Sequence, residues 1–166
     1  MKERLLREFA ERFGNAEGAQ VYFAPGRVNL IGEHTDYNGG HVFPCALDIG
    51  TYAVVRKRQD KRLFFYSMNY PETGIINSSL TGQLEHDDED GWANYPKGVI
   101  WAFEEKGMQP ACGFEMMVYG NLPSGAGLSS SASLEVLTGW ALRDIFKFEV
   151  SDQEIALISQ HAENTF

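Results

Sequence analysis

The chain has 166 residues, of which 43% are hydrophobic and 13% aromatic, with a formal net charge of −9. This length and composition predict one folded domain and argue against intrinsic disorder. Because phosphate contacts require clustered Lys and Arg, so acidic a chain is not expected to bind nucleic acid. The short basic run at residues 56–58 is expected to be a solvated strand end.

The cysteine content and the N-terminal segment indicate the cellular compartment in which the protein is expected. Cys45 and Cys112 are too few for a disulfide framework and form no Cys-x-x-Cys pair, so we expect two small, reduced core residues. Residues 1–13 are charged and amphipathic, without the apolar segment of a signal peptide, and no stretch reaches the length of a membrane span. We therefore predict a cytoplasmic protein with no membrane partner.

The first half of the chain is predicted to contain one helix followed by strands. Leu5, Leu6, Phe9 and Phe13 recur at helical spacing, and Gly14 follows as a stop. Extended runs separated by glycine, proline and charged residues predict the strands. These are expected at residues 21–24 (ended by Pro25-Gly26), 27–31, 42–55 (broken near 48–50) and 63–66, with a hairpin turn at 61–62.

The second half alternates helices with a strand. Residues 81–91 are acidic and are expected to form a solvated loop, with a metal site as the less favoured alternative. Ser151 and Glu154 have the spacing of a capping box, and the helix behind them runs to Phe166 without a stop signal. Helices are expected at residues 95–105, from about 131 to 145 and from 152 onward, with a strand at 114–119. Interspersed strands and helices indicate the α+β class.

A glycine- and serine-rich loop spans residues 122–133, between a predicted strand and a strongly apolar helix. Glycines allow a tight turn and close approach to a ligand, and the start of a helix carries partial positive charge that suits phosphate. The loop matches neither a Walker loop nor a dinucleotide fingerprint. An ordinary capped turn is the alternative, but four serines at residues 129–133 exceed what capping needs. The loop is therefore predicted to bind phosphate.

A second polar loop follows the strand predicted at residues 27–31. Carboxylates close together can accept hydrogen bonds from neighbouring sugar hydroxyls, and an arginine can neutralise phosphoryl charge. A metal site at Glu33, His34 and Asp36 is the less favoured alternative, because adjacent Glu and His point in different directions on an extended strand. A plain polar loop is the simplest alternative. The donors and acceptors are Arg27, Asn29, Glu33, His34, Asp36 and Asn38.

Four segments, in order along the chain, resemble one known family. Residues 25–40, Pro-Gly-Arg-Val-Asn-Leu-Ile-Gly-Glu-His-Thr-Asp-Tyr-Asn-Gly-Gly, resemble the galactokinase signature, and residues 92–99 and 160–164 resemble two further galactokinase blocks. The loop at 122–133 is similar to the phosphate motif of the galactokinase, homoserine kinase, mevalonate kinase and phosphomevalonate kinase (GHMP) superfamily. The resemblance implies the N-terminal half of the GHMP kinase fold (ribosomal protein S5 domain 2-like), a mixed β-sheet with packed helices.

The resemblance also implies roles for individual residues. Arg27 would stabilise the transferred phosphoryl group, and Ser131 and Glu163 would hold Mg²⁺. The galactose hydroxyls would be bound by Glu33, His34, Thr35 and Asp36. ATP would be bound by Ser67, Asn69, Trp92, Gly125, Gly127, Leu128, Ser129, Ser130 and Ser131, with Trp92 near the adenine.

The resemblance further implies what residues 1–166 do not encode. The general base of galactokinases is an Asp that lies beyond the Glu matched by Glu163, and this chain ends three residues after Glu163. We therefore expect an incomplete N-terminal nucleotide- and sugar-binding domain without its C-terminal domain. Such a chain would be inactive by itself, and its uncovered apolar surface would favour self-association.

Two other functions are compatible with the same motifs. A galactokinase-like sensor would bind ATP and galactose and signal to a transcription regulator, but sensors of that kind resemble galactokinases with a shortened serine loop. Here residues 129–133 are intact, which favours the enzyme. An N-acetylgalactosamine kinase would keep the chemistry and change the sugar.

Overall fold

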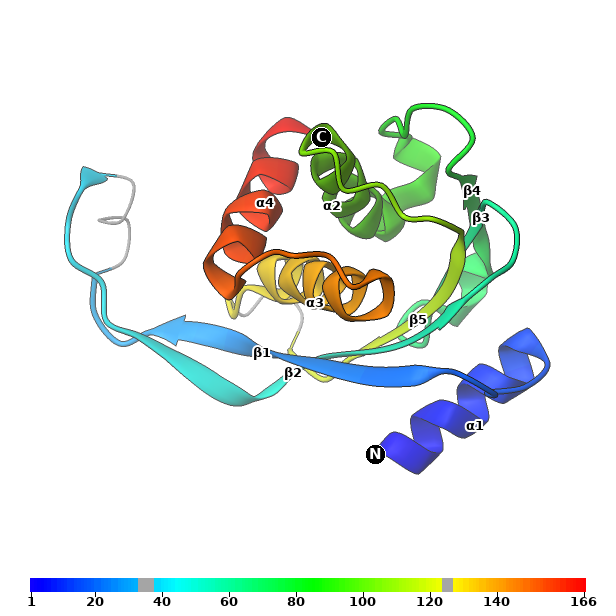
Figure 1. Ribbon diagram of the computed structural model, residues 1–166. Helices are drawn as coiled ribbons and strands as arrows, with labels where there is room; N and C mark the ends of the chain where they lie inside the picture. Colours follow the sequence, from blue (N-terminus) through cyan, green and yellow to red (C-terminus); the bar gives the residue numbers. More distant parts are fainter. Residues whose placement is uncertain (33–37, 124–126) are drawn as a thin grey trace.

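The computed structural model describes residues 1–32, 38–123 and 127–166. Within those ranges one five-stranded sheet, in the order β1-β2-β5-β3-β4, carries α2, α3 and α4 on one face and α1 on the other (Figure 1). The chain therefore has the α+β architecture that the sequence predicts. Its elements are α1 (Lys2–Phe13), β1 (Gln20–Asn29), β2 (Pro44–Lys57), β3 (Arg62–Ser67), η2 (Pro71–Thr73), β4 (Ile76–Ser79), η3 (Asp88–Ala93), α2 (Asn94–Glu105), β5 (Phe114–Gly120), α3 (Ser130–Phe146) and α4 (Asp152–Thr165).

Strand β5 lies between β2 and β3. It pairs antiparallel with β2 and parallel with β3, and β4 completes the sheet beside β3. The predicted hairpin at residues 61–62 is therefore wrong, because β2 and β3 are consecutive but not neighbours. Gly113, just before β5, is bonded to the segment that connects β2 to β3: its N donates to Asp60 O at 2.7 Å, and its O accepts from Arg58 N at 2.8 Å.

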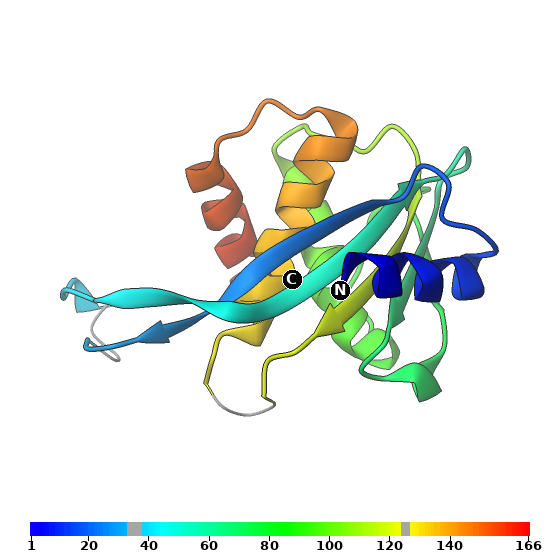
Figure 2. The ribbon, with the colours of Figure 1, turned by 90° about the horizontal axis from the view of Figure 1, so that it is seen from below.

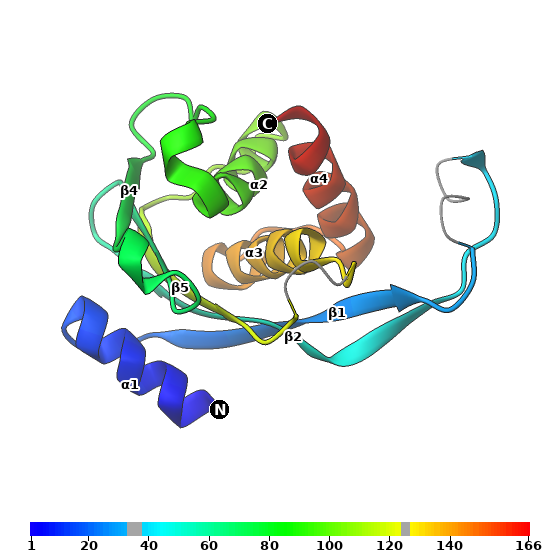
Figure 3. The ribbon, with the colours of Figure 1, turned by 180° about the vertical axis from the view of Figure 1, so that it is seen from behind.

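Burial alternates along the strands and gives the sheet two apolar faces. On β1, Tyr22 and Ala24 are buried toward the α2–α4 layer, whereas Phe23 is exposed on the other face. That other face is partly covered by α1, which inserts Leu5 and Phe9. Figure 3 shows α1 and α3 on opposite sides of the sheet. The larger core therefore lies between the sheet and the three-helix layer.

Strands β1 and β2 are continuous where the sequence predicted breaks. Pro25-Gly26 does not end β1: the register shifts between Pro25 and Arg27, and the strand continues to Asn29. Strand β2 is likewise continuous where a break was expected, and Gly50 pairs with Pro25. An irregularity on an edge strand accommodates a proline, which cannot donate to the ladder. The far ends of both strands project beyond the helices as a two-stranded ribbon (Figure 2).

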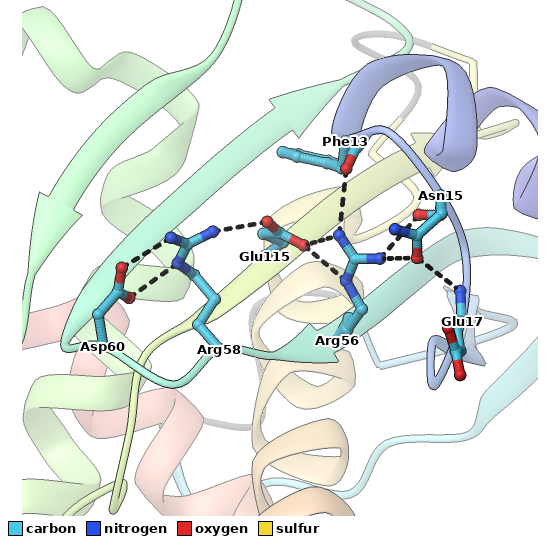
Figure 4. A network of polar contacts seen from close by, with 7 residues as sticks. All are labelled: Phe13, Asn15, Glu17, Arg56, Arg58, Asp60 and Glu115. Atoms are coloured by element: carbon cyan, nitrogen blue, oxygen red, sulfur yellow. Dashed lines mark hydrogen bonds and ion pairs between the residues drawn. The ribbon is translucent and has the colours of Figure 1, made fainter.

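A polar network fastens the α1–β1 connection to the sheet (Figure 4). Glu115 on β5 accepts hydrogen bonds from Arg56 Nε at 2.8 Å and from Arg58 Nη1 at 2.7 Å. Arg56 also donates to the carbonyl oxygens of Phe13 at 3.2 Å and Asn15 at 2.8 Å. One carboxylate, with a side chain only 7% exposed, thus holds two arginines in place.

The helix boundaries follow the sequence signals closely. Helix α1 ends at Phe13 and is followed by Gly14 with φ of 89°. The capping box at α4 is confirmed, since Ser151 Oγ accepts from Glu154 N at 3.2 Å and Glu154 Oε2 accepts from Ser151 N at 2.8 Å. No helix among the described residues is long and apolar enough to cross a membrane.

Other local expectations need correction. Part of the acidic segment at 81–91 is ordered as η3, because Asp87 accepts a hydrogen bond from Glu89 N at 2.9 Å. Strand β4 and η2 were not predicted, since both are short. The thiols of Cys45 and Cys112 are free, but Cys45 is exposed and Cys112 half-buried, so neither is the core residue expected.

Candidate functional site

A cleft of about 290 Å³, called here the strand-end cleft, lies where β3 and β5 end and α3 begins. Segments that are distant in the sequence meet in it. Its wall includes five residues predicted to bind nucleotide, namely Ser67, Asn69, Trp92, Ser130 and Ser131. Tyr70, Tyr95 and Leu122 also line it. The structure therefore brings most of the predicted nucleotide-binding residues into one place.

Asn69 fixes the strand ends that form the floor of this cleft. Its Nδ2 donates to Gly120 O at 2.8 Å, and its Oδ1 accepts from Gly120 N at 2.7 Å. The backbone N of Asn69 also donates to Ser67 Oγ at 3.2 Å. The side chain of Asn69 is thus committed to joining the ends of β3 and β5.

The start of α3 points unpaired donors at the cleft. The first N–H groups of a helix have no partner within it, and Ser129 at the N-cap makes no side-chain capping bond. Ser129 has φ of 59°, an uncommon left-handed conformation for a residue with a side chain. Ser133, by contrast, is structural, since its hydroxyl donates to Ala24 O at 2.9 Å and lies 3.0 Å from Thr51 Oγ1. Among the serines before it, Ser131 bonds to Glu163, whereas the hydroxyls of Ser129 and Ser130 form no hydrogen bond with the described residues.

Strand β1 and the glycine-serine loop lie side by side. The backbone N of Arg27 donates to Leu128 O at 3.2 Å. A Cβ atom at Gly26 would lie 2.4 Å from Leu122 Cδ2 and 3.1 Å from Leu128 O, so glycine allows the two segments to approach this closely. The side chain of Arg27 is exposed. The structure therefore joins the strand that leads into the galactokinase signature to the loop predicted to bind phosphate.

Two residues predicted to hold a metal ion meet across α3 and α4. Ser131 Oγ donates to Glu163 Oε1 at 2.7 Å, although 32 positions separate them. A hydroxyl and a carboxylate are hard oxygen donors, which suit Mg²⁺, so this pair fits the predicted ion. No group of three or more His, Cys, Asp or Glu residues in the described part of the chain is arranged to hold a metal ion.

Some predicted residues cannot be placed, and other residues were missed. Glu33, His34, Thr35, Asp36 and Gly125 lie outside the described residues. Gly127 lies within them, with φ of 66°. The residues missed near the site are Tyr70, Tyr95 and Glu135. Glu135 had a usable signal, since it is a charged residue directly beside the apolar stripe of α3.

Glu135 is a buried carboxyl group, with 1% of the residue exposed. Burial, and secondarily the charge of Glu163, raises its pKa from 4.5 to about 8. Below pH 4.5 the group is protonated in both folded and unfolded chains and has no effect on stability. As the pH rises toward 8, only the unfolded chain loses the proton, and the folded state loses stability.

We therefore expect Glu135→Gln to stabilise the protein in metal-free buffer. The gain should be below about 1 kcal/mol at pH 5 and reach about 3 kcal/mol at pH 7, because pH 7 lies roughly 2.5 units above 4.5 and one pKa unit corresponds to roughly 1.4 kcal/mol. Urea unfolding at several pH values measures it, with Glu89→Gln, an exposed carboxylate, as the control. If the difference in the free energy of unfolding between Glu135→Gln and wild type were the same at all pH values, the raised pKa of Glu135 would be contradicted.

The fold and this site define an N-terminal domain of the GHMP kinase class. Residues 94–166 match the family model of the GHMP kinases N terminal domain. The crystal structure of mevalonate kinase from Methanococcus jannaschii has the same fold, with a TM-score of 0.76 at 22% identity over 87% of this chain and 46% of that chain. That likeness concerns the fold alone.

Within this class the chain belongs to the galactokinase family. Residues 7–57 match the galactokinase galactose-binding signature. Galactokinases of Fusobacterium nucleatum and Bacillus subtilis are each 54% identical over 166 residues, which is 100% of this chain and 42% of each relative. The crystal structure of Lactococcus lactis galactokinase complexed with galactose gives a TM-score of 0.94 at 44% identity, covering 98% of this chain and 42% of that one. The chain thus spans less than half the length of these relatives.

Proposed function

We propose that this chain supplies the nucleotide- and galactose-binding domain of a galactokinase, which transfers the γ-phosphoryl group of ATP to the anomeric hydroxyl of galactose. The observation that carries the proposal is the junction of the signature strand with the glycine-serine loop, through Arg27 N and Leu128 O. This junction would set donor and acceptor sites next to each other. The L. lactis relative whose structure contains galactose supports the choice of sugar.

Each group in the site would have a separate task. The free N–H groups and hydroxyls at the start of α3 would bind the phosphates of ATP, where the helix dipole favours negative charge. The guanidinium of Arg27 would stabilise charge on the transferred group. Glu33 and Asp36 would accept hydrogen bonds from sugar hydroxyls and so orient the attacking oxygen. Mg²⁺ bound by Ser131 and Glu163 would neutralise phosphate charge.

The sugar assignment predicts that Glu33→Ala and Asp36→Ala each weaken galactose binding by about tenfold or more, because a hydrogen bond to a charged group contributes roughly 1.5–3 kcal/mol. ATP affinity should stay unchanged. Calorimetric titration of the 166-residue chain with each ligand separates the two effects. Asp48→Ala, which removes an exposed carboxylate from the same ribbon, is the matched control. Wild-type galactose affinity in both variants would refute the assigned role.

Turnover, we further propose, requires the general base and the second domain that longer galactokinases supply. A positioned base contributes about 10²- to 10⁴-fold, and orientation of two substrates can contribute about 7–11 kcal/mol. We expect the 166-residue chain to bind ATP but to show no galactose-dependent ADP release above background. A coupled ADP-release assay tests this, and full turnover would place the base within residues 1–166. We further propose that the 166-residue chain associates with itself and that the protein is located in the cytoplasm.

A further inference from the structure

A second, larger cavity of about 630 Å³ adjoins the strand-end cleft and shares Tyr70, Trp92 and Tyr95 with it. We call it the acidic cavity, because four carboxylate residues line it: Glu89, Asp90, Glu135 and Glu163. A polyanion such as ATP would be repelled from this wall unless a cation lay between them. A bound cation would offset the negative charge of this wall and allow ATP to approach it.

Glu135 is the most deeply buried of the four carboxylate residues in this wall. The residue is 1% exposed, and no donor among the described residues forms a hydrogen bond with it. Lys97, the buried lysine nearby, is committed to Asp90, with Nζ 2.5 Å from Asp90 Oδ2. Buried carboxyl groups without a partner are costly. A buried polar group without a partner calls for an explanation, and a bound ion is one such explanation.

Position along α3 directs Glu135 toward the predicted metal pair. Ser131 and Glu135 are four residues apart, so they lie on the same face of the helix. Glu163 on α4 accepts the hydrogen bond of Ser131 and is close enough that its charge acts on Glu135. The packed helices α3 and α4 thus place two carboxyl groups, those of Glu135 and Glu163, in the wall of the acidic cavity. Ser131, in the wall of the adjoining strand-end cleft, is hydrogen-bonded to Glu163.

We propose that Glu135 is a further oxygen-donor residue of the cation site formed with Ser131 and Glu163, supplying negative charge from the buried side of the site. The proposal rests on the proposed function, since it takes Mg²⁺ with ATP as the ligand. It gives a reason for an uncompensated carboxyl in the first turns of α3. Without a cation Glu135 would only reduce stability.

Binding of Mn²⁺, used as a paramagnetic substitute for Mg²⁺, tests the proposal on the 166-residue chain. Free Mn²⁺ is measured by electron paramagnetic resonance, with and without ATP. Glu135→Gln keeps the shape and removes the charge, and we expect it to weaken Mn²⁺ binding by about 10- to 100-fold, the range found for residues that support metal ligands. Metal-free ATP binding, followed by calorimetry, should be unchanged. Glu89→Gln, at an exposed carboxylate that also lines the acidic cavity, should match wild type.

The outcomes separate this inference from the proposed function. Absence of Mn²⁺ and ATP binding by the wild-type chain would overturn the proposed function and this inference with it. Wild-type binding with identical Mn²⁺ affinity in Glu135→Gln would overturn this inference alone. Thermal unfolding verifies that the variant is folded, and Glu135→Asp, which retains the charge, should recover part of the Mn²⁺ affinity. An equal loss of Mn²⁺ affinity in Glu89→Gln would also overturn this inference. The effect would then come from the total negative charge of the cavity and not from Glu135 in particular.

Discussion

Replacing Glu115 with alanine is expected to lower the free energy of unfolding by about 3 kcal/mol, because removing one partner of a buried ion pair leaves uncompensated charge. Glu115 binds both Arg56 and Arg58, whose side chains are only 16% and 25% exposed (Figure 4). Without the carboxylate, the two guanidinium groups would repel each other. Arg56 would also lose the orientation that lets it bond the chain after α1.

Urea unfolding with the Glu115→Ala variant measures this loss. Asp60→Ala is the matched control, since Asp60 also binds Arg58, at 2.7 Å, but its side chain is 43% exposed. Exposed ion pairs contribute little, so the control should be much closer to wild type. Equal effects of the two substitutions would show that burial does not determine the strength of this network. Glu115→Gln, which retains the shape without the charge, should fall between them.

Replacing Gly50 with alanine is expected to damage both the fold and the candidate site. A Cβ atom there would lie 2.0 Å from Ala24 O and 2.8 Å from Pro25 Cα, so the two strands would have to separate. Overpacking costs about 1–3 kcal/mol, and backbone atoms cannot move aside as side chains do. The displaced segment of β1 leads directly to Arg27. Asn121, which precedes the glycine-serine loop, also bonds both backbone groups of Gly50, its Oδ1 accepting from Gly50 N at 2.8 Å.

The matched control for this substitution is Gly113→Ala. Its Cβ would lie 1.9 Å from Arg62 O, an equal clash, at the other end of β5 from the strand-end cleft. Both variants should lose stability in urea unfolding. In the folded protein, however, only Gly50→Ala should weaken ATP binding measured by calorimetry. Equal ATP affinity in the two variants would show that the close contact between β1 and β2 at Gly50 does not position the site.

The sequence by itself determined the local elements whose signals lie within one turn or one strand. Helix α1 and its glycine stop, the capping box of α4 and the loop-to-helix junction at the start of α3 follow from spacing and from residue types a few positions apart. The family also follows from the sequence, because its motifs are contiguous segments. These features depend on neighbours along the chain, which is why a pattern predicts them.

Only the tertiary structure decided which segments lie next to each other. The insertion of β5 between β2 and β3 depends on pairing between strands that are far apart in the sequence, and the hairpin prediction failed for that reason. The contact of Ser131 with Glu163 and the burial of Glu135 arise from the packing of α3 on α4. Burial in turn changes the chemistry of a carboxyl group, because desolvation disfavours its charged form. The sequence marks Glu135 as a charged residue beside an apolar stripe, and the packing of α3 and α4 around it raises its pKa.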